Sequence, residues 1–533
     1  NDKITAVGTS VFTNLDISGD IDVDGTSNLD IVDIDGAVNM ASTLTVGDIV
    51  GIRTAAASSV ALTVKSTGNT DSALVVQQTG NTDGWGLTPD NTNGNLDFVR
   101  IGGGAGTYFR LAIDGSLSTP TAGTSNVRFG VNAGNSIASG GNYNVAIGDE
   151  AGTAITTGDD NTFIGYASGD ATTTSTGNTA VGRTALGTNI VGGLSTAVGA
   201  YALATQNPAT ATDMYNTGMG YNAGGAVTTG LQNTLIGALA GDALTDADNN
   251  IAIGMGALTT DTLGSTSVAI GTDALSAQNF TTATSTYNTA VGTSAGQSVT
   301  TGINNTIMGG LAGDALTDAD ANVAVGKGAL TSDTLGSRSV AIGQSALSAQ
   351  NFTTATDSYN VAVGYTAGLS ITTGRLNALV GGQVADALTT GTSNSAFGQN
   401  ALGADTAGNN SVAIGDSALR TQNFTTSTDS YNVAVGVGAG YAVTTGIHNT
   451  LIGGGAGDAL TNASHNVALG YNALGTDTLG AKSTALGRSA LGSQNFTTAT
   501  DAYNTAVGYD AGNAVTTGTL NTFIGGLAGS GNT

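Results

Sequence analysis

The stretch "NTAVGTSAGQSVTTGINNTIMG" (residues 288–309) contains one five-residue pattern twice, with closing glycines at Gly292 and Gly309. The pattern is Asn or Ser, two variable residues, an apolar residue and glycine. After a first gap of 18, the spacings run 17, 17, 17 and 21 and then repeat, so a longer period of 72 contains four units. A period kept this long predicts a repeat architecture. The pattern occurs 23 times, with closing glycines at positions 130, 148, 165, 182, 199, 220, 237, 254, 271, 292, 309, 326, 343, 364, 381, 398, 415, 436, 453, 470, 487, 508 and 525.

A unit of this length divides naturally into strand, turn, strand and turn. We expect the five-residue unit to be one short strand, Gly-x-x-Ala a tight turn, and the Thr/Val-rich patch, such as "AVTTG" at 226–230 and 442–446, a second strand. No window shows helical periodicity. Stacking of successive coils predicts an all-β fold, a parallel β-solenoid of about 23 coils. The recurring Asn predicts a ladder of hydrogen-bonded side-chain amides along the stack.

The strand residues also predict a partner. In "NTFIG" (161–165) and "NTLIG" (233–237) positions three and four are both bulky and apolar, and successive strand residues face opposite sides. A coil has one interior, so we expect the other face to meet copies of the same chain, most simply in a homotrimer. Position three is usually Ala but becomes large once in each longer period, which predicts trimer or core packing by Phe163, Leu235, Ile307, Leu379, Leu451 and Phe523.

The composition narrows the function classes. The chain has 533 residues, 83 of them Gly, with 3 Pro, no Cys and a net charge of −25. It is too apolar for wholesale disorder and lacks the period of collagen. Thirteen Lys and Arg cannot line a nucleic-acid track, and no apolar run is long enough to span a bilayer, so neither nucleic-acid binding nor membrane insertion is expected. The absence of Cys is compatible with an exported or virion-borne protein.

Two segments precede the repeats, which occupy residues 126–533. Residues 1–50 alternate Asp with Ile or Val and predict a β-shaft segment. Residues 51–125 contain longer strand candidates and the single Trp, Trp85, and predict a small antiparallel β-domain that caps the first coil.

Acidic clusters are candidate metal sites. Asp20, Asp22 and Asp24 begin an EF-hand-like pattern, but Ile31 stands where the bidentate acid belongs, so strand alternation is the stronger interpretation and Ca²⁺ the weaker one. No other cofactor is expected. Two aspartate-rich turns have non-acidic equivalents one period later, which indicates solvated turns; they contain Asp242, Asp246, Asp248, Asp314, Asp318 and Asp320.

The 21-residue gaps carry recurring aromatic residues beside amides. Four extra residues must bulge from each such coil, and an aromatic in a repeated surface loop suits contact with a sugar or another receptor. The alternative is that the rings fold back onto neighbouring coils. These candidate receptor-contact residues are Phe280, Tyr287, Phe352, Tyr359, Phe424, Tyr431, Phe496 and Tyr503, and in the first gap Pro208 takes the Phe place before Tyr215.

Catalytic chemistry is not expected. Glu150 is the only glutamate, and the two histidines, His448 and His465, lie in turns of different coils. No thiol exists, and nothing supports a Ser-His-Asp arrangement. The chain is therefore predicted not to be an enzyme.

The repeats resemble a known family. "NSVAIG" (410–415) followed by "DSA", and "STSVAIGTDA" (265–274), resemble the head repeat of trimeric autotransporter adhesins of the YadA type, which implies a left-handed β-roll with three chains side by side. Similar arrays occur in phage tail fibres. "NLDISGDIDVDG" (14–25) resembles their shaft repeats, and "YFRLAIDGSLSTP" (108–120) resembles the hinge segment before their chaperone-bearing tips.

The resemblance implies a mechanical function. We expect a rigid, multivalent, homotrimeric fibre of a virus particle, such as a phage tail fibre, that attaches to the host surface. Its expected partners are other virion structural proteins and a host glycan or protein receptor. The alternative is a bacterial cell-surface trimeric adhesin or an extracellular filament protein, located on the cell surface or outside the cell.

Overall fold

The computed structural model describes residues 74–77, 84–90, 95–101, 106–111, 117–118 and 122–531. The segment 1–50, with the weak Ca²⁺ candidates Asp20, Asp22 and Asp24, lies outside the described residues. In the described part of the chain no helix has the length and hydropathy needed to cross a membrane.

The first described strands form a five-stranded antiparallel sheet in which consecutive strands are neighbours. Phe98 and Phe109 are paired across two of its strands, with ring centroids 5.3 Å apart. The capping role expected of this sheet stays a prediction. The strands are β1 (Leu74–Gln77), β2 (Gly84–Asp90), β3 (Asn95–Ile101), β4 (Gly106–Leu111) and β5 (Leu117–Ser118).

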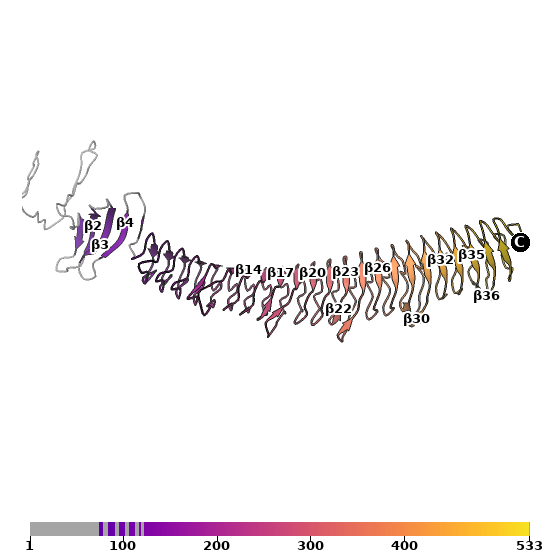
Figure 1. The fold of residues 1–533 in the computed structure, drawn as a ribbon, viewed down its shortest axis with the longest axis horizontal. Helices are drawn as coiled ribbons and strands as arrows, with labels where there is room; N and C mark the ends of the chain where they lie inside the picture. The colour runs from indigo at the N-terminus through magenta and orange to yellow at the C-terminus, as the bar shows by residue number, and fades with distance from the viewer. Residues whose placement is uncertain are drawn as a thin grey trace, which may run out of the picture. The chain divides into compact units, whose positions relative to one another are not determined.

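The rest of the described chain is a parallel β-solenoid whose coils stack in one row (Figure 1). Each of its 23 coils contributes one three-residue strand, which pairs in register with the strand of the next coil. The predicted all-β solenoid with 17-residue coils is therefore confirmed. The strands are β6 (Val127–Phe129), β7 (Val145–Ile147), β8 (Thr162–Ile164), β9 (Thr179–Val181), β11 (Thr196–Val198), β13 (Thr217–Met219), β14 (Thr234–Ile236), β15 (Ile251–Ile253), β17 (Val268–Ile270), β19 (Thr289–Val291), β20 (Thr306–Met308), β21 (Val323–Val325), β23 (Val340–Ile342), β25 (Val361–Val363), β26 (Ala378–Val380), β27 (Ser395–Phe397), β29 (Val412–Ile414), β31 (Val433–Val435), β32 (Thr450–Ile452), β33 (Val467–Leu469), β35 (Thr484–Leu486), β37 (Thr505–Val507) and β38 (Thr522–Ile524).

The second strand expected in each coil is absent at 226–230 and 442–446, where the backbone forms turns and bends. Thr228 donates its N–H to the next coil, to the carbonyl of Thr245 at 2.9 Å, but Val227 donates back to Gly224 of its own coil at 3.0 Å. Because the donors alternate between the next coil and the same coil, no continuous ladder of strand hydrogen bonds forms.

Shorter strands accompany the 21-residue coils instead. In each of these coils a two-residue strand pairs in parallel with a two-residue strand of the coil before it. The pairs are β10 (Gly192–Gly193) with β12 (Thr212–Asp213), β16 (Gly264–Ser265) with β18 (Thr284–Ser285), β22 (Gly336–Ser337) with β24 (Thr356–Asp357), β28 (Gly408–Asn409) with β30 (Thr428–Asp429), and β34 (Gly480–Ala481) with β36 (Thr500–Asp501).

The closing glycine of each unit is required by both its conformation and its neighbour. Gly309 has φ +132° and Gly343 has φ +132°, a region that side-chain-bearing residues rarely adopt. A Cβ at Gly343 would lie 2.2 Å from the carbonyl oxygen of Gly364 in the next coil. The glycines therefore stack directly on one another, which explains why the pattern keeps glycine in all 23 units.

The predicted amide ladder is present in the interior. The Oδ1 of Asn144 accepts the backbone N–H of Asn161 at 3.0 Å, and the Oδ1 of Asn161 accepts that of Asn178 at 3.0 Å. The Nδ2 of Asn161 donates to the carbonyl of Ser175 at 2.9 Å. The same bonds recur along the stack, so each buried amide satisfies backbone groups that have no access to water.

The third strand position points into the coil of its own chain. Phe163, Leu235, Ile307, Leu379 and Leu451 are all 0% exposed, and Phe523 in the last described coil packs against the same core. Core packing, one of the two expectations for this column, is therefore confirmed. The other expectation, that the column lies on an axis between chains, is wrong because these side chains are enclosed within their own coil. The position that faces outward is the fourth, one residue further along the strand.

The large third-position residues fill space left by glycines inside the coil. A Cβ built on Gly152 or Gly169 would lie 2.9 and 2.6 Å from the ring of Phe163. In the two coils that follow, the buried Leu186 and Leu203 stand at the place of these glycines. Large and small side chains thus complement one another between adjacent coils, as a close-packed interior requires.

Candidate functional site: the strand face and the fins

The outer strand face carries an apolar column made by the fourth position of all 23 units. Ile164 is 37% exposed and Met219 44% exposed, and the neighbouring fourth positions are half-buried or exposed. Consecutive members are one coil apart because their strands pair in register. The more exposed members of this apolar column are Phe129, Ile164, Met219, Met308, Ile342, Phe397, Ile414, Leu469, Leu486 and Ile524.

A second surface feature belongs to the 21-residue coils. We call the segment from the Phe (or Pro) to the Tyr of each long gap a fin. In Figure 1 the segments around β22 and β30 project beyond the neighbouring coils at one edge of the row. The five fins are residues 208–215, 280–287, 352–359, 424–431 and 496–503.

The phenylalanines that begin four of the fins are buried, with exposures of 5 to 7%. In the third fin the backbone N–H of Phe352 donates to the Oδ1 of Asp333 at 3.0 Å, and its carbonyl accepts the Oγ1–H of Thr334 at 2.8 Å. The prediction of receptor contact is therefore wrong for Phe280, Phe352, Phe424 and Phe496, which anchor the fin to the preceding coil. The alternative, in which the ring folds back, holds for these four.

A buried carboxylate holds each of these anchors. Asp333 is 0% exposed and accepts the N–H of Gly336 at 3.0 Å through Oδ1, in addition to that of Phe352. Its Oδ2 accepts the Nε2–H of Gln350 at 2.5 Å. Asp261, Asp405 and Asp477 repeat this arrangement, one in each of the other periods whose fin begins with Phe.

A buried glutamine continues the polar network inward. The Nε2 of Gln350 also donates to the Oγ of Ser339 at 2.8 Å, and its Oε1 accepts the Nδ2–H of Asn360 at 2.9 Å. Ser339 stands where other coils carry the ladder Asn, and its hydroxyl also bonds that of Ser358. Gln350 and Ser358 therefore restore the polar interior where the amide ladder is interrupted. This network was not predicted from the sequence, although the regular recurrence of Asp and Gln was a visible signal.

The first fin differs in a way that explains the network. Pro208 replaces the phenylalanine and has no N–H to donate, and Asn189 replaces the aspartate. The Oδ1 of Asn189 accepts the N–H of Gly192 at 3.0 Å, and its Nδ2 donates to the carbonyl of the same residue at 2.7 Å. An aspartate is thus present where the fin begins with a Phe that donates its backbone N–H, and an asparagine is present where the fin begins with Pro208, which has no N–H.

The tyrosines that end the fins are exposed, unlike the phenylalanines. Tyr287 is 62% exposed and Tyr359 is 49% exposed, and Tyr215, Tyr431 and Tyr503 lie in this range. Each has a left-handed backbone, with φ near +50°. This column precedes the first strand position of every coil, so the tyrosines lie on an exposed ridge beside the strands.

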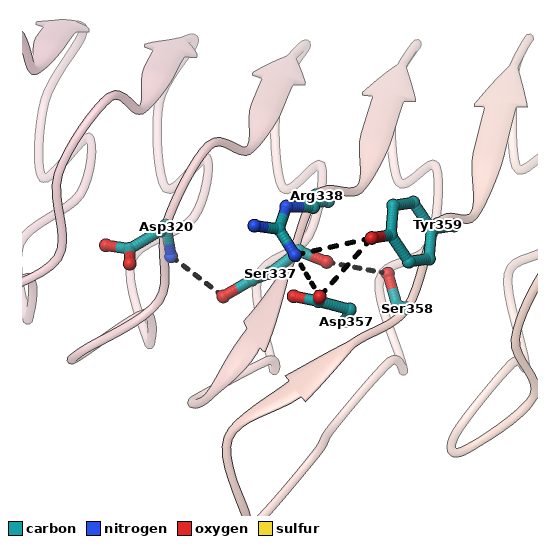
Figure 2. A network of polar contacts seen from close by, with 6 residues as sticks. All are labelled: Asp320, Ser337, Arg338, Asp357, Ser358 and Tyr359. Atoms are coloured by element: carbon teal, nitrogen blue, oxygen red, sulfur yellow. Dashed lines mark hydrogen bonds and ion pairs between the residues drawn. The ribbon is translucent and has the colours of Figure 1, made fainter.

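Figure 2 shows the polar network around the third fin. Arg338 donates from Nη1 to the Oδ2 of Asp357 and, at 3.3 Å, to the hydroxyl of Tyr359. Tyr359 in turn donates to Asp357 at 3.3 Å, and the guanidinium carbon lies 5.8 Å from the ring centroid. The hydroxyl of Ser337 accepts the backbone N–H of Asp320 from the coil before at 3.0 Å. The contacts with Arg338 and Asp357 hold the ring of Tyr359 by its hydroxyl end.

The fifth fin repeats this arrangement with a lysine. Lys482 donates from Nζ to Asp501 at 2.6 Å and to the hydroxyl of Tyr503 at 3.2 Å. The hydrogen bond with Asp501, followed by that with Tyr503, raises the pKa of Lys482.

An open groove lies beside the third fin. It has a volume of about 580 Å³ and is lined by residues of β22 and of the fin together with Arg375 and Leu376 of the following coil. A smaller groove of about 280 Å³ lies beside the first fin, between β12 and residues 174–176. The lining residues of the larger groove are Ser337, Ala355, Thr356, Asp357, Tyr359, Arg375 and Leu376.

The histidines form a feature that was not predicted from the sequence. His448 and His465 occupy the ridge position of consecutive coils, and their rings stack with centroids 4.9 Å apart and an interplanar angle of 5°. Tyr431 stacks on His448 at 5.4 Å. The available signal was that the two histidines are separated by one coil length, which places both in the same column.

The aspartate-rich turns bond to neighbouring coils. Asp246 accepts the hydroxyl of Thr229 at 2.5 Å, and Asp248 accepts the backbone N–H of Leu231 at 2.7 Å. Asp318 and Asp320 bond the preceding coil in the same way. Within the residues that the structure describes, no group of three or more His, Cys, Asp or Glu side chains is placed to hold a metal ion.

One acidic column is partly desolvated. Burial raises the pKa of Asp170, Asp386 and Asp458, against the opposing effect of hydrogen bonds from backbone N–H groups. The Oδ1 of Asp458 is buried without a hydrogen-bond partner. At the same place in other periods Asp242 and Asp314 accept a hydroxyl from Thr259 and Thr331 of the next coil, at 2.6 and 2.5 Å. Glycines replace this threonine beside the other three, namely Gly187, Gly403 and Gly475.

Comparisons with known proteins add nothing to this geometry: no family model, no curated protein and no solved structure matches the chain.

Proposed function

We propose that this chain is the structural rod of a surface appendage and that it works as a homotrimer. The observation that carries the proposal is the apolar column of the outer strand face, which continues through all 23 units. Isolated exposed apolar residues are ordinary, but a continuous apolar surface marks an interaction site.

The extent of the column supports a stable interface. With strands about 4.8 Å apart, 22 coil-to-coil steps give a length of about 105 Å. The second and fourth strand positions share the outer face and are separated by about 7 Å, so this face covers roughly 700 Å². That area is close to the roughly 800 Å² that one partner contributes to a standard stable interface, and in a homotrimer each chain divides it between two neighbours. A second copy of the same chain presents a matching column of equal length.

The appendage is proposed to belong to a virus particle, with a phage tail fibre as the model, and to attach to the host surface. A rod of repeated coils presents its five fins at regular intervals, about 19 Å apart for four coils, which suits multivalent binding. The resemblance of the repeats to YadA-type heads supports the second candidate, a bacterial cell-surface adhesin or extracellular filament. Immunogold labelling with an antibody against this chain distinguishes them: label on virus appendages supports the first, and label on cell envelopes supports the second.

Native mass spectrometry tests the homotrimer. We expect a mass of three copies of the 51.8 kDa chain. The triple variant Ile342→Lys, Ile414→Lys and Leu486→Lys places one charge on the apolar column in each of three successive long periods. All three positions face outward, so the fold should survive while the mass falls to that of one chain.

A matched control carries the same three charges on the fins. Thr353, Thr425 and Thr497 are exposed fin residues, and their replacement by Lys should leave the trimer mass unchanged. A parent chain that has the mass of a single copy, or a column variant that keeps three copies, would refute the proposed assembly.

A further inference from the structure

The groove beside the third fin contains a basic side chain that nothing in the described structure engages. Arg375 is exposed, and its side chain makes no hydrogen bond, ion pair or ring contact with the described residues. Its backbone is held, because its carbonyl accepts the N–H of Ser393 at 3.0 Å and the adjacent Leu376 donates to Ser358 at 2.9 Å. The guanidinium is therefore carried by an ordered coil but is free to bind a ligand.

Basic side chains without a partner are rare among residues 122–531. Within residues 122–531, Lys327 is the other basic side chain without a described partner. Six others are engaged by backbone, carboxylate or tyrosine groups, namely Arg128, Arg183, Arg338, Arg420, Lys482 and Arg488. Arg375 differs from Lys327 because it also lines a groove.

The other groups of the groove define the chemistry of its ligand. The ring of Tyr359 offers an apolar surface that its hydroxyl contacts hold in place. Asp357, Ser337 and Thr356 add hydroxyl or carboxylate oxygens at the wall. A planar guanidinium binds carboxylates through two parallel hydrogen bonds. Apolar surface, several acceptors and one free guanidinium together suit a sugar ring that bears a carboxylate.

The remaining fins lack this combination. The place of Arg375 is taken by Leu231 in the first period, by Ile303 and Ile447 in the second and fourth, and by Thr519 in the fifth. The groove volume of about 580 Å³ lies within the range of small-molecule sites. We propose that the groove of the third fin binds a carboxylated pyranose, a uronic or sialic acid residue of a surface polysaccharide, through Arg375 and Tyr359. This inference rests on the proposed function of surface attachment and names its ligand.

Saturation-transfer NMR on the full chain tests the site. The probes are sialyllactose, an oligogalacturonate and neutral lactose, in about 0.15 M salt, where charges beyond about 8 Å are screened. We expect one or both acidic sugars to bind with a dissociation constant on the order of 1 mM, and the probe that binds identifies the acid. Arg375→Ile, which installs the residue of the second and fourth periods, should weaken that binding at least about tenfold because a charged hydrogen-bonding group is lost.

Two further variants separate a specific site from a general effect of charge. Lys327→Gln removes the other free cation and should leave binding unchanged. Tyr359→Leu introduces the residue type that Leu376 already provides in the same ridge column, and it should weaken the acidic sugars severalfold. Equal binding by the parent and Arg375→Ile, or no binding of either acidic sugar, overturns the proposal.

The outcome is independent of the assembly test. A chain that has the mass of a trimer but binds neither acidic sugar refutes the groove ligand alone. A chain that binds the sugar through Arg375 but has the mass of a single copy refutes the trimeric rod alone.

Discussion

The two kinds of coil in this solenoid enclose their polar interior differently. In a 17-residue coil the buried amide of Asn322 accepts the N–H of Ser339 at 2.9 Å and donates to the carbonyl of Gly336 at 2.9 Å. In the 21-residue coil that follows, Ser339 is too short for this task, and Gln350, which precedes the fin, and Ser358, which lies within it, replace the missing amide. A coil can therefore carry an outer feature, the fin, and still satisfy the interior polar groups where the amide ladder is interrupted.

The largest expected effect concerns the closing glycine, which both kinds of coil share. Gly309→Ala lies before a 17-residue coil and Gly343→Ala before a 21-residue coil, and both have φ +132°. Each variant combines backbone strain with a clash against the next coil, so we expect each to lower the free energy of local opening by about 3 kcal/mol or more. Native-state hydrogen exchange of the adjacent coils measures this energy, because a repeat protein opens locally. A much smaller loss at either site would show that the two kinds of coil do not stack alike.

A smaller effect is expected within the fin network. Asp333→Asn turns an amide donor toward the Nε2 of Gln350 and breaks a buried bond of 2.5 Å. We expect the free energy of local opening of the third fin, measured by hydrogen exchange, to fall by about 1–3 kcal/mol, since a buried polar group loses its partner.

The natural control is the first fin, in which Asn189 is already present. Asn189→Asp should also destabilise, because Pro208 offers no N–H to the added charge. If both substitutions were neutral, the pairing of Asp with Phe and of Asn with Pro would have no energetic basis.

The smallest expected effect concerns one aspartate position, which is compared between two 17-residue coils. Burial raises the pKa of Asp458 in the folded state, so the folded chain binds its proton more tightly than the unfolded chain. The associated stability is present below the ordinary carboxyl pKa of about 3.9 and is lost as the pH rises through the folded value. Asp458→Asn should therefore stabilise its coil at pH 7, by at most about 0.5 kcal/mol, and remove this pH dependence. Hydrogen exchange at pH 7 and at low pH measures both. Asp242→Asn, in which the hydroxyl of Thr259 donates to a neutral instead of a charged oxygen, serves as the control and should not stabilise.

The sequence was sufficient for the repeat but not for the orientation of its columns. The glycine period predicted the number and length of the coils, and the recurring Asn predicted the amide ladder. The third and fourth strand positions are both apolar, as in Phe163 and Ile164, and alternation shows only that they face opposite sides. The closed path of the whole coil decides which side is the interior. For the large third-position residues, core packing was confirmed and only the axis between chains was wrong.

The candidate site shows a similar division. The period placed Phe352 and Tyr359 in one bulge, but it could not separate the buried anchor from the exposed ring, because both are aromatic residues of one short loop. The groove could not be foreseen either, since Arg375 and Tyr359 belong to different coils of the solenoid and line one groove only when one coil stacks on the next.

What the sequence determined by itself is whatever repeats along the stack. A residue that recurs in every coil lies above its own copy, so spacing alone predicts the glycine column and the amide ladder. Only the tertiary structure decided which way each side chain points and how deeply it is buried. It shows which of the two apolar columns is enclosed, and which aromatic residue of the fin is buried. The physical reason is that burial depends on the closed path of a whole coil and on the volume left by its neighbours, as the glycines around Phe163 show.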